Sequence, residues 1–330
     1  MGYARKHLIS LQDTPYYHVV SRCVRRAWLW GQDDFAGRDY SHRKQWVIDR
    51  LAHLSEIFAI EICAYAVMSN HYHLVVFVDC EKAKRWTAEQ VIHRWSQLHQ
   101  QPHLIQRYQA SDVLPAEHEA AMRIIETWRE RLFDISWFMR HLNEYLARRA
   151  NAEDDCTGRF WEGRFKSQAL LDEAGLLTAM AYVDLNPIRA GVASTPEESE
   201  FTSIYQRIRQ RGPASTEQSA PKQIVRLRGF ADETHTRKLG IPYTSLDYLQ
   251  LVDWSGRIIR EGKHGYIDEK LPPILARLCI DAEMWQLAIA RKGTVLGRAM
   301  GRLDLMRLHA ATLGQAWIHG LKRSQRMYAN

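Results

Sequence analysis

The chain has 330 residues, a formal net charge of +7 and 46% hydrophobic residues, a composition typical of a soluble globular protein. No apolar run is long enough to span a bilayer, and the first ten residues lack the apolar stretch of a secretion signal, so we expect a cytoplasmic protein with no membrane partner. The cysteines are odd in number and form no C-x-x-C pair, which argues against a disulfide framework and a cysteine zinc site (Cys23, Cys63, Cys80, Cys156 and Cys279).

The positive charge is concentrated in the last third of the chain. Residues 221–330 hold 18 Lys and Arg against 10 Asp and Glu, whereas residues 1–220 hold 27 against 28. A basic region favours polyanions, because cations that neutralise phosphates release bound counterions. A solvated basic surface without a partner explains the charge equally well, so charge alone does not identify a ligand.

The first part of the chain predicts a strand, a helix and a hairpin. Residues 16–24 are rich in aromatic and β-branched types, which is typical of a strand. Apolar residues at near-helical spacing predict a helix over 39–58. Two strands follow at 59–68 and 71–78, and the short polar turn between them predicts a hairpin, with His71 at the start of its second strand.

Helices dominate the prediction beyond this hairpin. Helical segments are expected at 80–131 with breaks near Pro102 and 111–115, at 134–149 before an acidic loop at 151–156, at 173–184 with Asp172 as its N-cap, at 281–291 and at 294–308. The composition of 194–221, rich in Ser, Pro, Gln and Glu, predicts a linker. We therefore divide the chain into a domain at 1–195, a linker at 196–220 and a mostly helical basic region at 221–330.

His71 and His73 are candidate ligands of a divalent ion. They stand two apart on a predicted strand, so both side chains project from one face and can reach one ion together. One H-x-H pair is nevertheless expected about once by chance among 15 histidines. On the pair alone, two strand histidines hydrogen-bonded in or near the core are the more common arrangement.

Four sequence blocks, taken in order, resemble the HUH-endonuclease superfamily. They are the strand region at 16–26, VMSNHYHLVV at 67–76, GRFWEGRFKS at 158–167 and AYVDLNPIRAG at 181–191. They are most similar to the single-tyrosine transposases, in the branch of REP-associated tyrosine transposases (REP, repetitive extragenic palindrome). The resemblance covers roughly residues 10–195. Residues 80–133 are longer than the family's compact core suggests, so we interpret them as a helical insertion.

The resemblance implies a fold and an activity. The expected fold is α+β, with a central antiparallel sheet flanked by helices (an HUH, ferredoxin-like core), the helical insertion and a mostly helical basic C-terminal region. The implied activity is cleavage and rejoining of single-stranded DNA at hairpin-type repeats, as in DNA transposition and recombination. Single-stranded or hairpin DNA would be the partner, which would associate the protein with the nucleoid. Whether the protein is a monomer or a homodimer stays open.

The resemblance also assigns roles to individual residues. Tyr182 would be the nucleophile that forms a 5′-phosphotyrosine, and His71, His73 and Asn186, four positions after Tyr182, would hold Mg²⁺ or Mn²⁺. Taken alone, Tyr182 would be read as an amphipathic core residue with its hydroxyl at the surface. Two other functions remain open: a non-catalytic, sequence-specific DNA-binding protein on the same fold, and a metal-dependent nuclease that uses water.

Cations and an aromatic residue alternate in the block at 158–167. Arg159, Trp161, Arg164 and Lys166 suit a DNA path with phosphate contacts and base stacking, although core aromatics beside solvated cations fit equally well. Arg298 and Arg302 stand four apart on one face of the helix expected at 294–308, which suits a DNA-reading helix. A structural cap on the catalytic domain is the alternative for this region.

Overall fold

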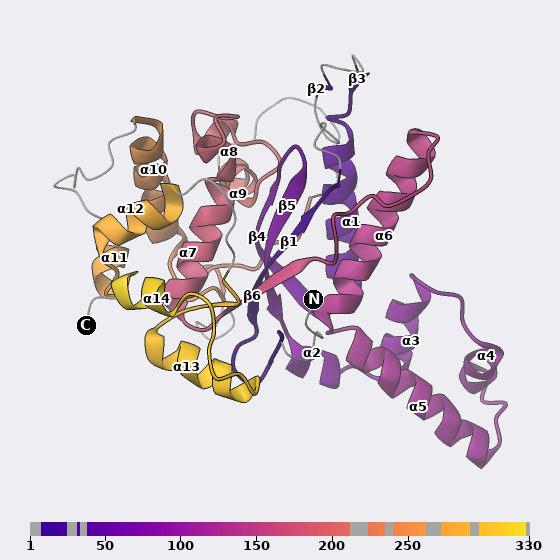
Figure 1. Ribbon diagram of the computed structural model, residues 1–330. Coiled ribbons are helices and arrows are strands. Elements are labelled where there is room, and N and C mark those ends of the chain that lie inside the picture. The colour runs from indigo at the N-terminus through magenta and orange to yellow at the C-terminus, as the bar shows by residue number, and fades with distance from the viewer. Residues whose placement is uncertain are drawn as a thin grey trace.

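The computed structural model describes residues 8–24, 32–33, 38–211, 224–234, 240–261, 272–290 and 297–327. A sheet runs through the middle of the molecule and helices cover both of its faces (Figure 1). This arrangement confirms the predicted α+β class. Within the described ranges, no helix has both the length and the apolar character that crossing a membrane requires.

The central sheet has five strands in the order β4-β5-β1-β6-β7. β1 pairs antiparallel with β5 on one side and with β6 on the other, and β4 and β5 form the predicted hairpin. β7 adds a parallel pair at the edge beside β6. The strands are β1 (Tyr16–Arg22), β4 (Ile60–Val67), β5 (His71–Val78), β6 (Lys166–Leu170) and β7 (Ala299–Met300), and a separate pair joins β2 (Gln32–Asp33) to β3 (Arg38–Asp39).

The pleat of β5 separates its side chains into two sets. Tyr72 and Leu74 are buried in the core on one face of the sheet. Val75 is buried in the core on the other face, and His71 and His73 share its side because side chains alternate along a strand. The candidate metal ligands therefore face a different layer of helices from Tyr72 between them.

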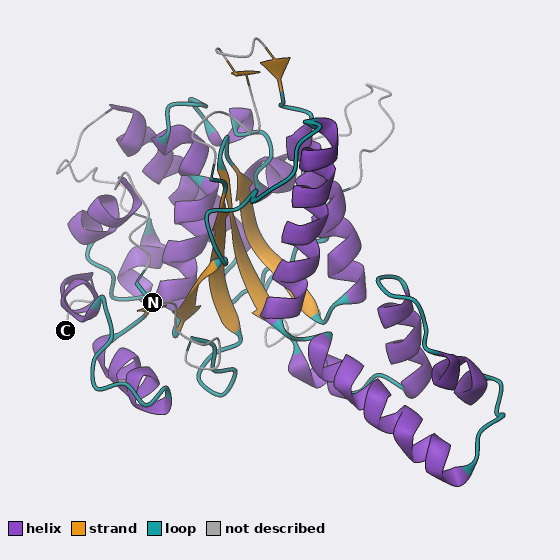
Figure 2. Ribbon diagram, turned by 45° about the vertical axis from the view of Figure 1, so that its right-hand side comes forward, coloured by secondary structure: helices purple, strands orange, loops and turns teal. Residues whose placement is uncertain are grey.

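The face that buries Tyr72 is covered by α1, α6 and the insertion. As predicted, the insertion is helical, and it extends away from the sheet (Figure 2). Its helices pack on one another through aromatic rings, such as the stacked pair Trp95 and Trp128. The helices of this face are α1 (Arg43–Ile57), α2 (Cys80–Lys84), α3 (Ala88–Ser96), α4 (His103–Gln109), α5 (Pro115–Arg131) and α6 (Ile135–Glu153).

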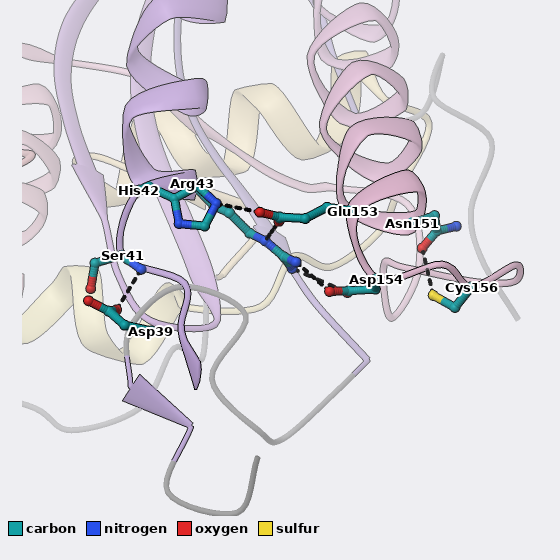
Figure 3. Close-up of polar contacts among 8 residues, drawn as sticks. All are labelled: Asp39, Ser41, His42, Arg43, Asn151, Glu153, Asp154 and Cys156. Carbon is teal, nitrogen blue, oxygen red and sulfur yellow. Dashed lines mark hydrogen bonds and ion pairs between the residues drawn. The ribbon is translucent and has the colours of Figure 1, made fainter. Parts of the chain in front are cut away.

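α6 is longer than predicted and runs into the expected acidic loop. Arg43, at the start of α1, has a fully buried side chain that forms ion pairs with Glu153 and Asp154 (Figure 3). A buried guanidinium requires such partners, because an unpaired charge away from water is costly. These acidic residues therefore join the end of α6 to the start of α1 instead of forming a free loop.

The opposite face of the sheet is covered by helices from the second half of the chain. Asp172 caps the first of them as predicted, because its Oδ1 accepts from the Gly175 backbone N–H at 2.7 Å. Asp281 likewise caps α12 through the Met284 N–H at 2.9 Å. The helices here are α7 (Glu173–Asp184), α8 (Asn186–Arg189), η2 (Pro196–Glu198), α9 (Ser203–Arg211), α10 (Ser245–Glu261), α11 (Pro273–Arg277) and α12 (Ala282–Ala290).

Part of the predicted linker is a helix that packs on the sheet. α9 lies within 196–220 and buries Ser203, Ile204 and Arg207. Its Arg207 donates through Nη2 to the backbone oxygens of Cys63 on β4 and Arg228. Residues 212–223 lie outside the described residues. The division of the chain into domains stays a prediction.

The helix predicted over 294–308 is wrong in its first half. Residues 299–300 form β7, which pairs with β6, and the helix α13 begins only at Leu303 (Leu303–Thr312; α14 is Leu321–Met327). Gly301 separates the two with φ = +152°, a conformation that helices do not use. Strand pairing at the sheet edge has overridden the local helical pattern, so Arg298 and Arg302 do not share a helix face.

A buried carboxylate joins α7 to the C-terminal helices. The Asp184 side chain is fully buried and accepts from the hydroxyls of Ser203 and Tyr248 and from the Ile204 backbone N–H. Burial raises the pKa of Asp184 to about 6, although the hydrogen bonds to Ser203 and Tyr248 oppose this. The end of α7 is thereby fixed to α9 and α10.

Removing one donor from this network should destabilise the fold. We expect Tyr248→Phe to lower the free energy of unfolding by about 1.5–3 kcal/mol, because Asp184 loses a charge-assisted hydrogen bond in a buried site. Urea unfolding followed by circular dichroism measures the change. Tyr205→Phe is the matched control, since the exposed pair of Tyr205 and Arg209 should contribute less than about 0.5 kcal/mol. Equal effects of the two variants would contradict the assigned role of Asp184.

Candidate active site

Three histidines lie together on one face of the sheet. His73 is fully buried and His71 partly buried, and their ring centroids are 4.9 Å apart, so the two do share one face as the sequence predicted. His18 on β1 joins them: its Nε2 lies 2.9 Å from Nδ1 of His73. The pair therefore belongs to a cluster of three imidazoles.

His18 was missed by the sequence analysis. It lies in a run that correctly predicts a strand, and no motif distinguishes it there. In the sheet, Val20 is the register partner of His73, and His18 is two residues from Val20 on the same face. Only the pairing of β1 with β5, which sequence periodicity does not reveal, brings His18 to His73.

Tyr182 lies over this cluster. It stands in the last turns of α7, partly buried, with its ring centroid 5.8 Å from that of His73 and 6.2 Å from that of His18. The helix reaches the sheet because its apolar side chains, such as Leu177 and Met180, are buried against β4 and β5. A phenol far along the chain thus meets the histidines of the sheet.

Arg189 lies against the phenol ring of Tyr182. Its Cζ is 3.8 Å from the ring centroid of Tyr182, and its side chain is only 8% exposed. Nη1 donates to the backbone oxygens of Tyr182 at 3.4 Å and of Ile289, on α12, at 3.2 Å. The residue belongs to the quoted tyrosine block, but the sequence offered no signal for its position.

Asn186 begins α8, just after the helix that carries Tyr182. It is 5% exposed, and its Nδ2 is buried without a hydrogen-bond partner. No hydrogen bond among the described residues joins its side chain to His71 or His73. Its place as a third metal ligand therefore stays a prediction.

The histidines are held in the neutral form. Burial lowers the pKa of His18 and of His71 to about 4, with the positive charge of Arg189 acting in the same direction. Burial also lowers the pKa of His73 well below its usual value. Neutral imidazole is the form that binds metal ions.

The ring nitrogens are arranged as metal-binding histidines require. Nδ1 of His71 lies 2.7 Å from Oδ1 of Asn70, and Nδ1 of His73 faces His18. Such partners fix the tautomer of a ligating histidine and leave its second nitrogen available. Nε2 of His73 is buried without a hydrogen-bond partner. His71 and His73 therefore fit a divalent ion.

A third donor for an ion on His71 and His73 would have to come from another residue type. Within the described ranges, no three His, Cys, Asp or Glu side chains are placed so that they could hold an ion together. An amide oxygen such as that of Asn186 is outside that set, and oxygen donors suit Mg²⁺ and Mn²⁺.

The residues predicted to contact DNA fall into three groups. Arg159 donates to the oxygens of Trp161 and Glu162, and Trp161 donates to the Asn143 oxygen at 2.9 Å, so these two side chains shape their own loop. Arg298 donates to Gln315, and Arg302 forms an ion pair with Asp304 away from the histidines. Arg164 and Lys166 are exposed.

Lys166 has the most informative position of these. It is paired with Val20, which is in turn paired with His73, so these three residues form one row across the sheet. Directly opposed residues project from the same face, so Lys166 lies on the histidine face. Arg22 holds the corresponding position opposite His71.

Comparisons with known proteins add little. No family model matches the chain, and no curated protein matches it. The structure is similar to that of a REP-associated tyrosine transposase bound to a REP hairpin, with 12% identity over 69% of this chain and 99% of that chain. The TM-score is 0.37, which is too low to support a conclusion about fold or function.

The lowered pKa values predict a loss of stability in mild acid. Unfolding lets each buried histidine take up a proton at its ordinary pKa of 6.5, whereas the folded state resists protonation down to about 4. The free energy of unfolding should therefore fall as the pH drops from 6.5 toward 4, by up to about 3 kcal/mol per histidine. Asp184, whose pKa is raised to about 6, opposes this because its protonation stabilises the fold.

Urea unfolding at a series of pH values in EDTA measures this dependence. His18→Gln removes one titrating group, so its stability should fall less steeply than that of the unsubstituted protein over the same pH range. Identical slopes for the two proteins would show that His18 is not held neutral by the fold.

Proposed function

We propose that this protein cleaves and rejoins single-stranded DNA at hairpin-type repeats through a covalent tyrosine intermediate, as a transposase does. The observation that carries the proposal is the contact of Tyr182 with the histidine cluster. The ring centroids of Tyr182 and His73 are 5.8 Å apart. These residues lie in separate sequence blocks, on either side of a large insertion, and folding brings them together. A phenol beside two imidazoles with free ring nitrogens suits a metal-assisted attack on phosphate.

His71 and His73 would hold the ion, with Asn186 as the third ligand. Mn²⁺ accepts imidazole nitrogen more readily than Mg²⁺ does, and both suit an amide oxygen. When bound, such an ion polarises the phosphate and stabilises charge on its oxygens. His18 would orient His73 through the hydrogen bond to Nδ1.

The bond changes balance without water or an energy source. The phenol oxygen of Tyr182 attacks phosphorus, and the bond from phosphorus to the 3′ oxygen of the neighbouring nucleotide breaks. The phenol gives up its proton, and the departing 3′ oxygen takes up a proton. The products are a 5′-phosphotyrosine and a free 3′-hydroxyl. Since the phosphoester is retained, a 3′-hydroxyl can attack it in turn and rejoin the strands.

The surroundings of the site suit a DNA strand. Lys166 lies in the row of His73, and Arg22 lies opposite His71. Both would contact backbone phosphates beside the histidines. Arg164, exposed on the loop before β6, extends the same basic edge. Arg298 and Arg302, at the far edge of the sheet, would contribute only if the DNA extends along β7.

Loss of the Tyr182 hydroxyl should abolish the covalent intermediate. The assay incubates a pool of single-stranded hairpin oligonucleotides, with randomised flanks and a label at the 3′ end, with the protein and Mn²⁺. The unsubstituted protein should give a labelled adduct that migrates slowly on a denaturing gel, and Tyr182→Phe should give none. Tyr16→Phe, on β1 at the far end of its pairing with β5, is the matched control and should retain the adduct.

The alternatives predict different results in the same assay. A nuclease that uses water would cleave with Tyr182→Phe and lose cleavage with His71→Ala. A DNA-binding protein without activity would retain the oligonucleotides and cleave none. Either result would overturn the proposal.

Metal binding provides a separate measurement. His71→Ala should abolish Mn²⁺ binding detected by electron paramagnetic resonance, and His18→Ala should weaken it about 10- to 100-fold because His73 loses its orienting partner. His18→Gln, which restores a hydrogen-bond acceptor, should recover part of the affinity. His99→Ala, beside Trp95 on the other face of the sheet, is the control. Unchanged affinity in His71→Ala would exclude the histidine pair as the ion site.

A further inference from the structure

Arg189 is a buried cation with no acidic partner among the described residues. The other buried arginines each have an acidic group nearby: Arg43 is paired with Glu153 and Asp154, Arg228 is paired with Glu61, and the positive charge of Arg207 favours the ionised form of Asp184. The histidines near Arg189 supply no negative charge, because an imidazole is either neutral or positive. A charge removed from water without a counter-ion is costly, which favours a site that an anion completes.

The guanidinium is fixed with one edge uncommitted. Both of its protein hydrogen bonds, to the oxygens of Tyr182 and Ile289, come from Nη1. No hydrogen bond from Nε or Nη2 to protein is found within the described ranges. These two groups form one of the paired donor edges with which arginine binds a phosphate through two parallel hydrogen bonds.

The position of the guanidinium identifies the anion. The guanidinium lies 3.8 Å from the ring centroid of Tyr182, which is itself in contact with His73 and His18. An anion held there would lie beside the phenol and the histidine cluster. We propose that Arg189 binds the phosphate that Tyr182 attacks, and that α12 holds Arg189 in place through the Ile289 oxygen.

This assignment rests on the proposed function for the identity of the phosphate, and it gives the C-terminal region a direct part in the site. Arg189 stabilises the negative charge that grows on the phosphate oxygens during attack. The ring of Tyr182 is in contact with the guanidinium, so the same residue also keeps the nucleophile in place.

A binding cycle tests the contact without cleavage. The probe is the hairpin oligonucleotide that the Tyr182→Phe protein selects from the randomised pool, used in EDTA so that no divalent ion contributes. A neutral methylphosphonate replaces each phosphate of the single-stranded flank in turn. At one position the methylphosphonate should weaken binding roughly 10-fold or more. In the protein that also carries Arg189→Ala, the methylphosphonate at that position should have no such effect. Equal weakening with and without Arg189 at every position overturns the assignment.

Cleavage and chemical rescue provide the second measurement. Arg189→Ala should lower the rate of adduct formation about 100-fold, and millimolar methylguanidinium should restore part of it. Arg189→Lys keeps the charge but not the paired donors, so its rate of adduct formation should lie between those of the unsubstituted protein and Arg189→Ala. A variant that loses activity only by unfolding would show a lowered melting temperature and no rescue, and that result counts against the proposal.

Arg207→Ala is the matched control. Arg207 is also buried, lies 4.4 Å from the centroid of the Phe230 ring and donates to two backbone oxygens, but it is on α9 and away from the histidines. The folded Arg207→Ala protein should form the adduct, and methylguanidinium should not change its rate. Should the unsubstituted protein form no adduct, the proposed function fails while the binding cycle still tests the phosphate contact. If the adduct forms but no phosphate position depends on Arg189 in the binding cycle, the role of Arg189 is contradicted and the proposed function is not.

Discussion

The backbone of β5 alternates its side chains between the two faces of the sheet, and the molecule uses these faces for different purposes. Tyr72 and Leu74 enter the apolar core beneath α1 and α6, and the Tyr72 hydroxyl donates to Asn143 on α6. His71 and His73 enter a polar site beneath α7. A shift of one residue in the pairing would exchange the two sets, so the apolar core also fixes the direction of the histidines.

Buried polar groups fix α7, the helix that carries Tyr182, to the helices around it. Asp184 joins the end of α7 to α9 and α10, and Arg189 joins the next turn to α12. Both charges are buried, and both are oriented by hydrogen bonds, so a small rotation of α7 would leave them unsatisfied. The position of Tyr182, which lies on α7 and precedes both residues, is therefore set by α9, α10 and α12.

Much of this arrangement was predictable because it depends on local pattern. The strand composition and the polar turn predicted the hairpin with His71 at the start of its second strand, the Asp172 cap predicted the start of α7, and the pattern of 80–131 predicted its helices. Three features depend on distant pairing and were not predictable. His18 reaches the cluster only because β1 pairs with β5, and β7 forms only against the edge of β6. The packing of α9 depends on its hydrogen bonds to Asp184. For each, a tertiary partner decides what the local sequence leaves open.

Net charge was a poor guide to the site for a related reason. The excess of Lys and Arg lies in residues 221–330, yet the cation in contact with Tyr182 comes from the nearly neutral first part of the chain. Coulomb energies scale inversely with the effective dielectric constant, about 80 in water and about 20 near protein, so one buried guanidinium beside Tyr182 outweighs several solvated ones. What the last third contributes at this point is a backbone oxygen, that of Ile289, which orients the charge. A count of charges along a sequence does not separate solvated cations from buried ones, and it gives no sign of such a contact.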